Sequence, residues 1–181
     1  MNKLLRDMLI IFVLTLITVY SYGFVHETAH WTACKIIGLN GNITIDLIKD
    51  PPLYMANCEG INEQTNFSKF LFWGFPYIVS LVIMVLFLIF LDKEKFYLLG
   101  FPLGIFFNDA MNIFGLYSWT YKTGNTGNDL LNILLKTPKV YYIIIAIVLT
   151  LTFLFFLMNI FSFYKKLYTN ARNHHKNSIS K

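Results

Sequence analysis

Two histidines and a glutamate in the first part of the chain have the types and spacing of a metal-dependent hydrolase site. Residues 24–31 read FVHETAHW, so His26, Glu27 and His30 form an H-E-x-x-H pattern. On a helix, residues four apart lie on one face, so His26 and His30 can present two ring nitrogens to one zinc ion. Glu27 adjoins the first histidine and can act as a general base toward a water that the metal activates. The pattern predicts two zinc ligands and one catalytic carboxylate.

The pattern is more specific than a casual match. The chain of 181 residues has only four histidines, and with its His and Glu content an H-E-x-x-H is expected by chance about 0.002 times. The motif also follows a long apolar stretch, and ionisable groups near membrane depth are costly and usually functional. The structural alternative is a helix end at the membrane surface whose polar side chains meet water or lipid headgroups.

A catalytic zinc ion typically has three protein ligands and one open position, so one more ligand is needed. Two acids are candidates: Asp109 in FFNDAMNIFG and Asp129 in TGNDLLNIL. We expect Asp109 inside a span, where it would be a ligand or an acceptor that holds a ligand imidazole. Asp129 is expected on the outer side, unless its segment folds back, and it also suits a helix N-cap. Both acids remain candidates for a site with one zinc ion per chain.

The elements that must position these residues are membrane helices. The chain is 56% hydrophobic and 14% charged, far too apolar for an ordinary soluble domain. Apolar runs long enough to cross a bilayer predict an all-α membrane protein of about four transmembrane helices. The expected spans are about residues 8–38, 70–91, 96–119 and 141–164. The net charge of +5 is no sign of a nucleic-acid partner, because most basic residues flank these runs.

Basic residues precede the first span, separate the second from the third and follow the fourth. The positive-inside rule therefore predicts a multi-pass protein of the cell membrane with both termini cytoplasmic. Residues 165–181 form a polar tail that we expect to be disordered. Residues 39–69 and 120–139 would be external, and GNITIDLI within the first predicts a short strand or hairpin. Cys34 and Cys58 allow one disulfide on an oxidising side, or two free thiols.

From the motif onward, the sequence resembles the site-2 protease clan of intramembrane zinc metalloproteases. After the second histidine, HWTACKIIG matches an element of small residues, a basic residue and then glycine. Gly74-Phe75-Pro76 is a looser match to a Gly-Pro near the start of the second core helix. Asn112-Ile113-Phe114-Gly115 looks like an Asn-x-x-Pro element with glycine for proline, and Asn128-Asp129-Leu130 looks like a Leu-Asp-Gly element without its glycine.

The resemblance implies a three-helix metalloprotease core from the first three spans, with the fourth span as an addition, all within residues 1–164. It implies that the strand-like external loop of residues 39–69 receives substrate. It also favours Asp129 over Asp109 as the third zinc ligand, because the aspartate of the Leu-Asp-Gly element is a ligand in that family. Gly74 and Pro76 would then pack or kink the second helix beside the site, or serve ordinary span packing.

These observations lead to one main hypothesis and one alternative. The main hypothesis is a zinc metalloendopeptidase that hydrolyses peptide bonds of membrane-anchored polypeptides in the lipid bilayer. Asn112 and Asn128 would bind substrate or the oxyanion, or else satisfy nearby backbone groups. The alternative is a non-catalytic membrane protein with a structural or sensory metal site. Glu27 separates the two, because a structural zinc site normally has four protein ligands and needs no general base.

Overall fold

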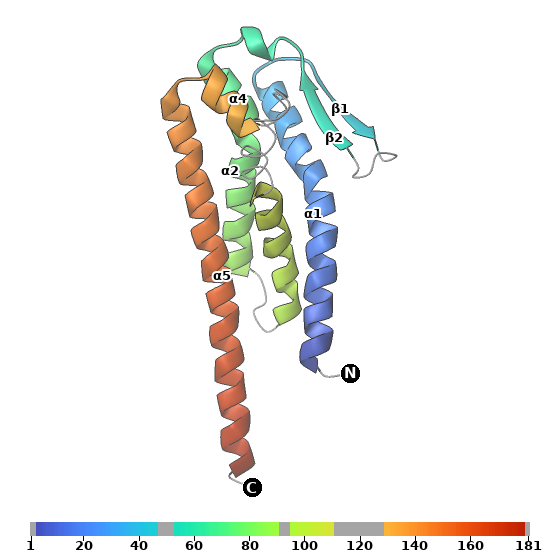
Figure 1. Ribbon diagram of the computed structural model, residues 1–181, viewed down its shortest axis with the longest axis vertical. Coiled ribbons are helices and arrows are strands. Elements are labelled where there is room, and N and C mark those ends of the chain that lie inside the picture. The colour runs from blue at the N-terminus through green and yellow to red at the C-terminus, as the bar shows by residue number, and fades with distance from the viewer. Residues whose placement is uncertain (1–2, 47–52, 91–94, 111–128, 180–181) are drawn as a thin grey trace, which may run out of the picture.

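The structure is a bundle of long helices with a small hairpin at one end (Figure 1). This computed structural model describes residues 3–46, 53–90, 95–110 and 129–179. Its elements are α1 (Lys3–Ile36), β1 (Gly41–Asp46), β2 (Leu53–Cys58), a 3-10 turn η1 (Ile61–Glu63), α2 (Asn66–Phe90), a second 3-10 turn η2 (Phe96–Leu99), α4 (Asp129–Lys136) and α5 (Lys139–Ile179). Residues 100–110, directly after η2, are also helical.

Three of the helices are long and apolar enough to cross a membrane. The candidate spans are Leu5–Ile36 in α1, Asn66–Phe90 in α2 and Lys139–Lys165 in α5. Many large apolar side chains on their outer faces are exposed, as is usual for helices whose solvent is lipid. The prediction of a mostly helical membrane protein is therefore confirmed. The predicted third span, residues 96–119, is described only as far as residue 110.

Glycines let neighbouring helices approach closely. A Cβ added at Gly100 would lie 2.6 Å from the Leu14 Cβ, and one at Gly104 would collide with Thr18, so the helix of residues 100–110 packs directly on α1. In α2, a Cβ at Gly74 would lie 2.9 Å from Cδ1 of Ile145 in α5. Small residues at helix contacts are the usual means of close packing in membranes.

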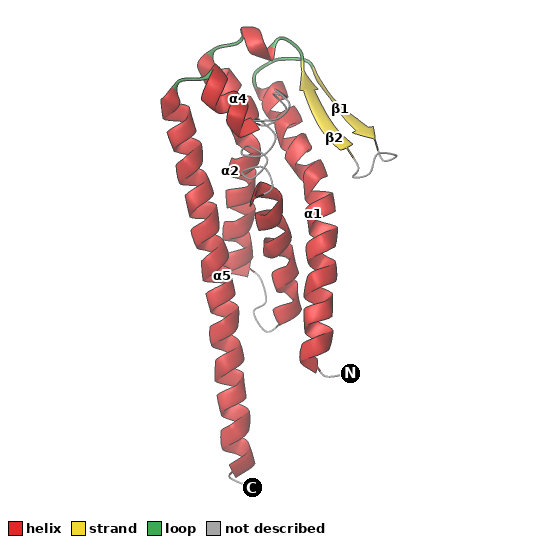
Figure 2. Ribbon diagram, in the orientation of Figure 1, coloured by secondary structure: helices red, strands yellow, loops and turns green. Residues whose placement is uncertain are grey.

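The segment between α1 and α2 contains the hairpin that was expected from GNITIDLI. Strands β1 and β2 pair in antiparallel register, with Gly41 opposite Cys58 and Ile43 opposite Ala56. Figure 2 shows the two strands alone at one end of the bundle, beside the C-terminal part of α1. The short strand prediction is confirmed for β1, while β2 was not delimited from the sequence.

One expectation about the end of the chain is wrong. The polar tail is helical through Ile179, because residues 165–179 contain neither proline nor glycine to end α5. The segment before α5, which was expected on the outer side, contains a helix. Its residues from Asp129 to Lys136 form α4, which packs against α2 and α5 (Figure 1).

Candidate metal centre

The H-E-x-x-H residues lie on the inward face of α1, near its C-terminal end. His26 and His30 are buried, and their ring centroids are 5.0 Å apart. One ligand atom from each of His26, Glu27 and His30 lies within 4.8 Å of the others. No proline or glycine interrupts the helix between Gly23 and Ile36. Residues four positions apart therefore lie side by side, which makes the two imidazoles neighbours.

Asp129 completes this cluster from a segment a hundred residues away. Its Oδ2 atom is 3.0 Å from Nε2 of His26 and 3.0 Å from Nε2 of His30. Burial would raise the pKa of the Asp129 carboxyl, but the neighbouring imidazoles of His30 and His26 outweigh it and hold that pKa below its ordinary value. The carboxylate is at the first position of α4, and the packing of α4 against α2 brings it to the histidines.

The distance of the Asp129 oxygen from each imidazole nitrogen suits a zinc ion. Zinc bonds to imidazole nitrogen and carboxylate oxygen are about 2.0–2.1 Å long, so two ligand atoms at a tetrahedral angle are about 3.3 Å apart. The Asp129 oxygen is 3.0 Å from each imidazole nitrogen. Outward shifts of a few tenths of an ångström would therefore make room for the ion. The set has two nitrogens and one oxygen, which is the composition of a catalytic rather than a structural zinc site.

A backbone carbonyl orients the second histidine. Nδ1 of His30 donates to the Phe72 carbonyl oxygen at 2.7 Å, which fixes the ring so that Nε2, on the Asp129 side, can bind a metal in place of a proton. That carbonyl is available because the residue four positions later in α2 is Pro76, which has no N–H to donate within the helix. Pro76 therefore acts on the site through Phe72 and His30.

Glu27 contacts the hairpin. Its Oε2 atom accepts a hydrogen bond from the backbone N–H of Ala56 in β2 at 2.7 Å. This bond holds the carboxylate of Glu27 in one orientation beside the first histidine. A carboxylate has two oxygens, so Oε1 is left for a water or a substrate group.

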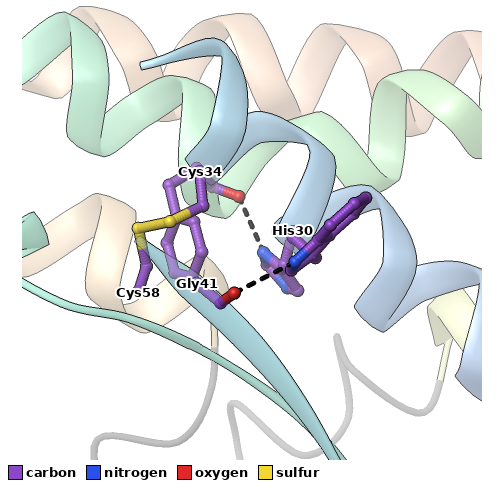
Figure 3. The surroundings of a disulfide bond; sticks show 6 residues. His30, Cys34, Gly41 and Cys58 are labelled. Atoms are coloured by element: carbon purple, nitrogen blue, oxygen red, sulfur yellow. Dashed lines mark hydrogen bonds between the residues drawn. A yellow bond between two sulfur atoms is a disulfide. The ribbon is translucent and has the colours of Figure 1, made fainter. Parts of the chain in front are cut away.

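A disulfide ties the same hairpin to α1. Cys34, one turn after His30, is bonded to Cys58 at the end of β2 (Figure 3). Of the two sequence-level possibilities, pairing or free thiols, the structure has the pair. Gly41, opposite Cys58, is required here, because an added Cβ would lie 2.8 Å from the Cys34 sulfur. The Gly41 carbonyl also accepts a hydrogen bond from the Trp31 indole at 3.1 Å.

The other acid does not join the two imidazole Nε2 atoms. Asp109 is buried, and neither of its oxygens has a hydrogen-bond partner among the described residues. Gly74 contacts α5 rather than the histidines, in keeping with a packing role. Asn112 and Asn128 lie outside the described residues, as does the Asn-x-x-Gly element.

Sequence reasoning missed the backbone groups of the site. The Phe72 carbonyl and the Ala56 amide have no side-chain signal, although Pro76 four residues after Phe72 marks a free carbonyl in any helix. It also missed Tyr77, whose ring meets His26 edge-on at 5.8 Å between centroids. A tyrosine in an apolar span is a weak signal, because tyrosines are frequent in this chain.

Comparison with known proteins finds no relative of this chain. No family model, no curated protein and no solved structure matches the chain.

Proposed function

We propose that this protein is a membrane-embedded zinc metallopeptidase. The observation that supports it most is the position of Asp129, whose Oδ2 atom lies 3.0 Å from Nε2 of both His26 and His30. Three ligand atoms from two distant segments thus converge beside the Glu27 carboxylate. The site-2 protease resemblance points to the same three ligands, and the open fourth position of such a set suits hydrolysis.

Each residue of the site has its own role in the proposed hydrolysis. His26, His30 and Asp129 would hold the ion, which when bound supplies a Lewis acid that polarises the peptide carbonyl and acidifies water. Glu27 takes a proton from the attacking water through Oε1 and delivers it to the leaving amine. The Ala56 amide keeps the other oxygen of Glu27 fixed, so the base does not have to reorient between the two proton transfers.

The orientation in the membrane follows from charge and redox chemistry. Disulfides form on the oxidising side of a membrane, so the Cys34–Cys58 bond favours an extracytoplasmic hairpin. By their place in the sequence, nine of the fifteen basic residues lie toward the opposite ends of the helices and six toward the hairpin, which favours cytoplasmic termini. Together with the helix of residues 100–110 as part of a further span, this gives a protein of four spans with three of them around the site.

The site would then lie close to the outer boundary of the bilayer. From Leu5, where the first candidate span begins, α1 rises about 30 Å to His26, which is about the thickness of the hydrocarbon core. A peptide bond at that depth belongs to a polypeptide anchored in the membrane or lying on its outer surface. The substrate class is therefore a membrane-anchored polypeptide, cleaved where it leaves the outer leaflet.

The test separates metal binding from hydrolysis. Full-length protein purified in lipid nanodiscs should contain one zinc ion per chain, and His26→Ala should remove it. A variant with His174→Ala and His175→Ala should keep the ion, which excludes the tail as its source. In cells, profiling of the N-termini of membrane proteins should reveal cleavage products with the wild type that are missing with Glu27→Gln.

The matched control for the base is Glu63→Gln, which changes an exposed glutamate of η1 on the same side of the membrane. It should leave both zinc and cleavage unchanged. Zinc retained in Glu27→Gln with cleavage lost supports the enzyme. Zinc retained with identical N-termini in wild type and Glu27→Gln would contradict it and favour a structural or sensory metal site.

A further inference from the structure

A row of buried side chains extends from the metal centre into the bundle. Thr18, Tyr22, His26, His30 and Cys34 follow one another at four-residue spacing on α1, and all are buried. Residues at this spacing share one helix face. The residue of this row next to the site on the inner side is Tyr22, whose hydroxyl is hydrogen-bonded to the hydroxyl of Ser80 in α2; Thr18 lies a further turn away.

The two histidines of the site differ in their second ring nitrogen. His30 donates its Nδ1–H to the Phe72 carbonyl. Nδ1 of His26 is buried and has no hydrogen-bond partner among the described residues. A metal-binding histidine almost always donates its other N–H to a carboxylate, carbonyl or water, which fixes the tautomer and the ring orientation. His26 therefore needs an acceptor.

Asp109, on the helix of residues 100–110, is an acceptor that needs a donor. It is 3% exposed, and both of its oxygens lack partners in the described part of the chain. The Ser80 hydroxyl can donate its one proton to the Pro76 carbonyl at 3.2 Å while it accepts from Tyr22. On the helix of residues 100–110, Gly104 meets Thr18, and the Asn108 amide donates to the Val19 carbonyl at 3.5 Å, so Asp109 lies near the level of Tyr22, about one turn before His26.

Tyr77 of α2 lies beside His26. Its ring meets the ring of His26 edge-on, with 5.8 Å between the centroids. The hydroxyl is buried and also has no partner among the described residues. A donor on His26, an acceptor on Asp109 and a hydroxyl that does both are thus buried near the same level of the bundle, and each unpaired group of this kind costs free energy. One hydrogen-bonded chain would satisfy all three.

We propose that Asp109 is a positioning residue for the metal centre, which accepts the Nδ1–H of His26 through the Tyr77 hydroxyl or a water between them. The proposal rests on the proposed zinc site. Asp109 keeps the Nε2 lone pair of His26 directed toward the ion, as the Phe72 carbonyl does for His30. Each histidine then has its own acceptor, one from α2 and one from the helix of residues 100–110.

The experiment measures metal binding by full-length protein in nanodiscs. Zinc affinity is determined by competition with a chelator, and the visible absorption of the cobalt-loaded protein reports ligand geometry. Asp109→Leu should weaken zinc binding by about 10–100-fold and shift the cobalt bands, as loss of an outer-shell carboxylate does at other sites. Asp109→Asn should weaken it by less, because its amide oxygen still accepts. The matched control is Thr18→Val, which removes another unpartnered buried hydroxyl two turns below His26 and should bind zinc as the wild type does.

Circular dichroism checks that each variant folds. If Asp109→Leu does not fold, the zinc affinity of Asp109→Asn tests the proposal. A loss in Tyr77→Phe equal to that in Asp109→Leu assigns the bridge to the tyrosine, whereas an unaffected Tyr77→Phe assigns it to water. Zinc binding within twofold of wild type in both Asp109 variants would overturn the inference alone. A wild type without zinc would overturn the inference and the proposed function together.

Discussion

Pro76→Ala should weaken zinc binding although residue 76 touches no ligand atom of the metal. In α2 the carbonyl four residues earlier is that of Phe72, which accepts the Nδ1–H of His30 at 2.7 Å. Alanine restores an N–H at position 76, and this N–H is aimed along the helix at the same carbonyl. The imidazole of His30 then competes with the helix for its acceptor.

The expected loss is about tenfold in zinc affinity, or about 1.4 kcal/mol. It lies at the low end of the 10–100-fold effect of outer-shell changes, because a carbonyl has two lone pairs and can serve both donors in part. The free energy of unfolding should not fall. A proline inside a helix costs about 3 kcal/mol relative to alanine, so the gain from alanine offsets the loss from the small cavity that it leaves in a buried position. Zinc affinity and thermal stability should therefore change in opposite directions.

Chelator competition gives the zinc affinity of Pro76→Ala in nanodiscs, and circular dichroism on heating gives the stability of the metal-free protein. Pro102→Ala is the matched control, because Pro102 is also buried in a helix but lies near the level of Thr18, well below the histidines. It should bind zinc normally. Wild-type zinc affinity in Pro76→Ala, in a protein that loses its zinc on His30→Ala, would refute the account of how His30 is oriented.

Three further predictions concern the packing that supports the site. Gly41→Ala should lower the melting temperature by an amount equivalent to about 1–3 kcal/mol, because the new Cβ would lie 2.8 Å from the Cys34 sulfur; an unchanged melting curve would contradict this contact. Cys58→Ser should lower the free energy of unfolding by about 3 kcal/mol, the typical effect of a disulfide that closes a loop of this length. A reductant should destabilise the wild type but should have no additional effect on the unfolding of Cys58→Ser. Gly104→Ala should destabilise the protein, because the new Cβ would collide with the Thr18 Cβ and lie 2.9 Å from the Thr15 carbonyl oxygen; an unfolding curve like that of the wild type would contradict this close approach of the two helices.

Local pattern was sufficient for the parts of the site that lie on one helix. The spacing of His26, Glu27 and His30 sets their common face without any tertiary information, and long apolar runs predict α1, α2 and α5 as spans. The first strand was also recognisable from its alternation of apolar and polar residues.

Contacts between distant segments were beyond that pattern. Depth counting along the chain put Asp129 beyond the end of the third span but could not show that it meets the histidines; the packing of α4 on α2 brings it to them. The pairing of Cys34 with Cys58 depends on the hairpin register, which two cysteines alone do not specify. The acceptor for His30 is a backbone carbonyl, which is the same in every residue; Pro76, four residues later, indicates that this carbonyl is free but not which donor reaches it.

The central claim is that His26, His30 and Asp129 hold one zinc ion. X-ray absorption at the zinc edge of the full-length protein tests it most directly, together with the zinc content per chain. The account predicts one ion with two imidazoles in a shell of light-atom ligands at about 2.0–2.1 Å and no sulfur, and Asp129→Ala should lose an oxygen ligand and most of the bound zinc. Protein that carries no zinc, zinc held by sulfur at about 2.3 Å, or an unchanged spectrum in Asp129→Ala would contradict it.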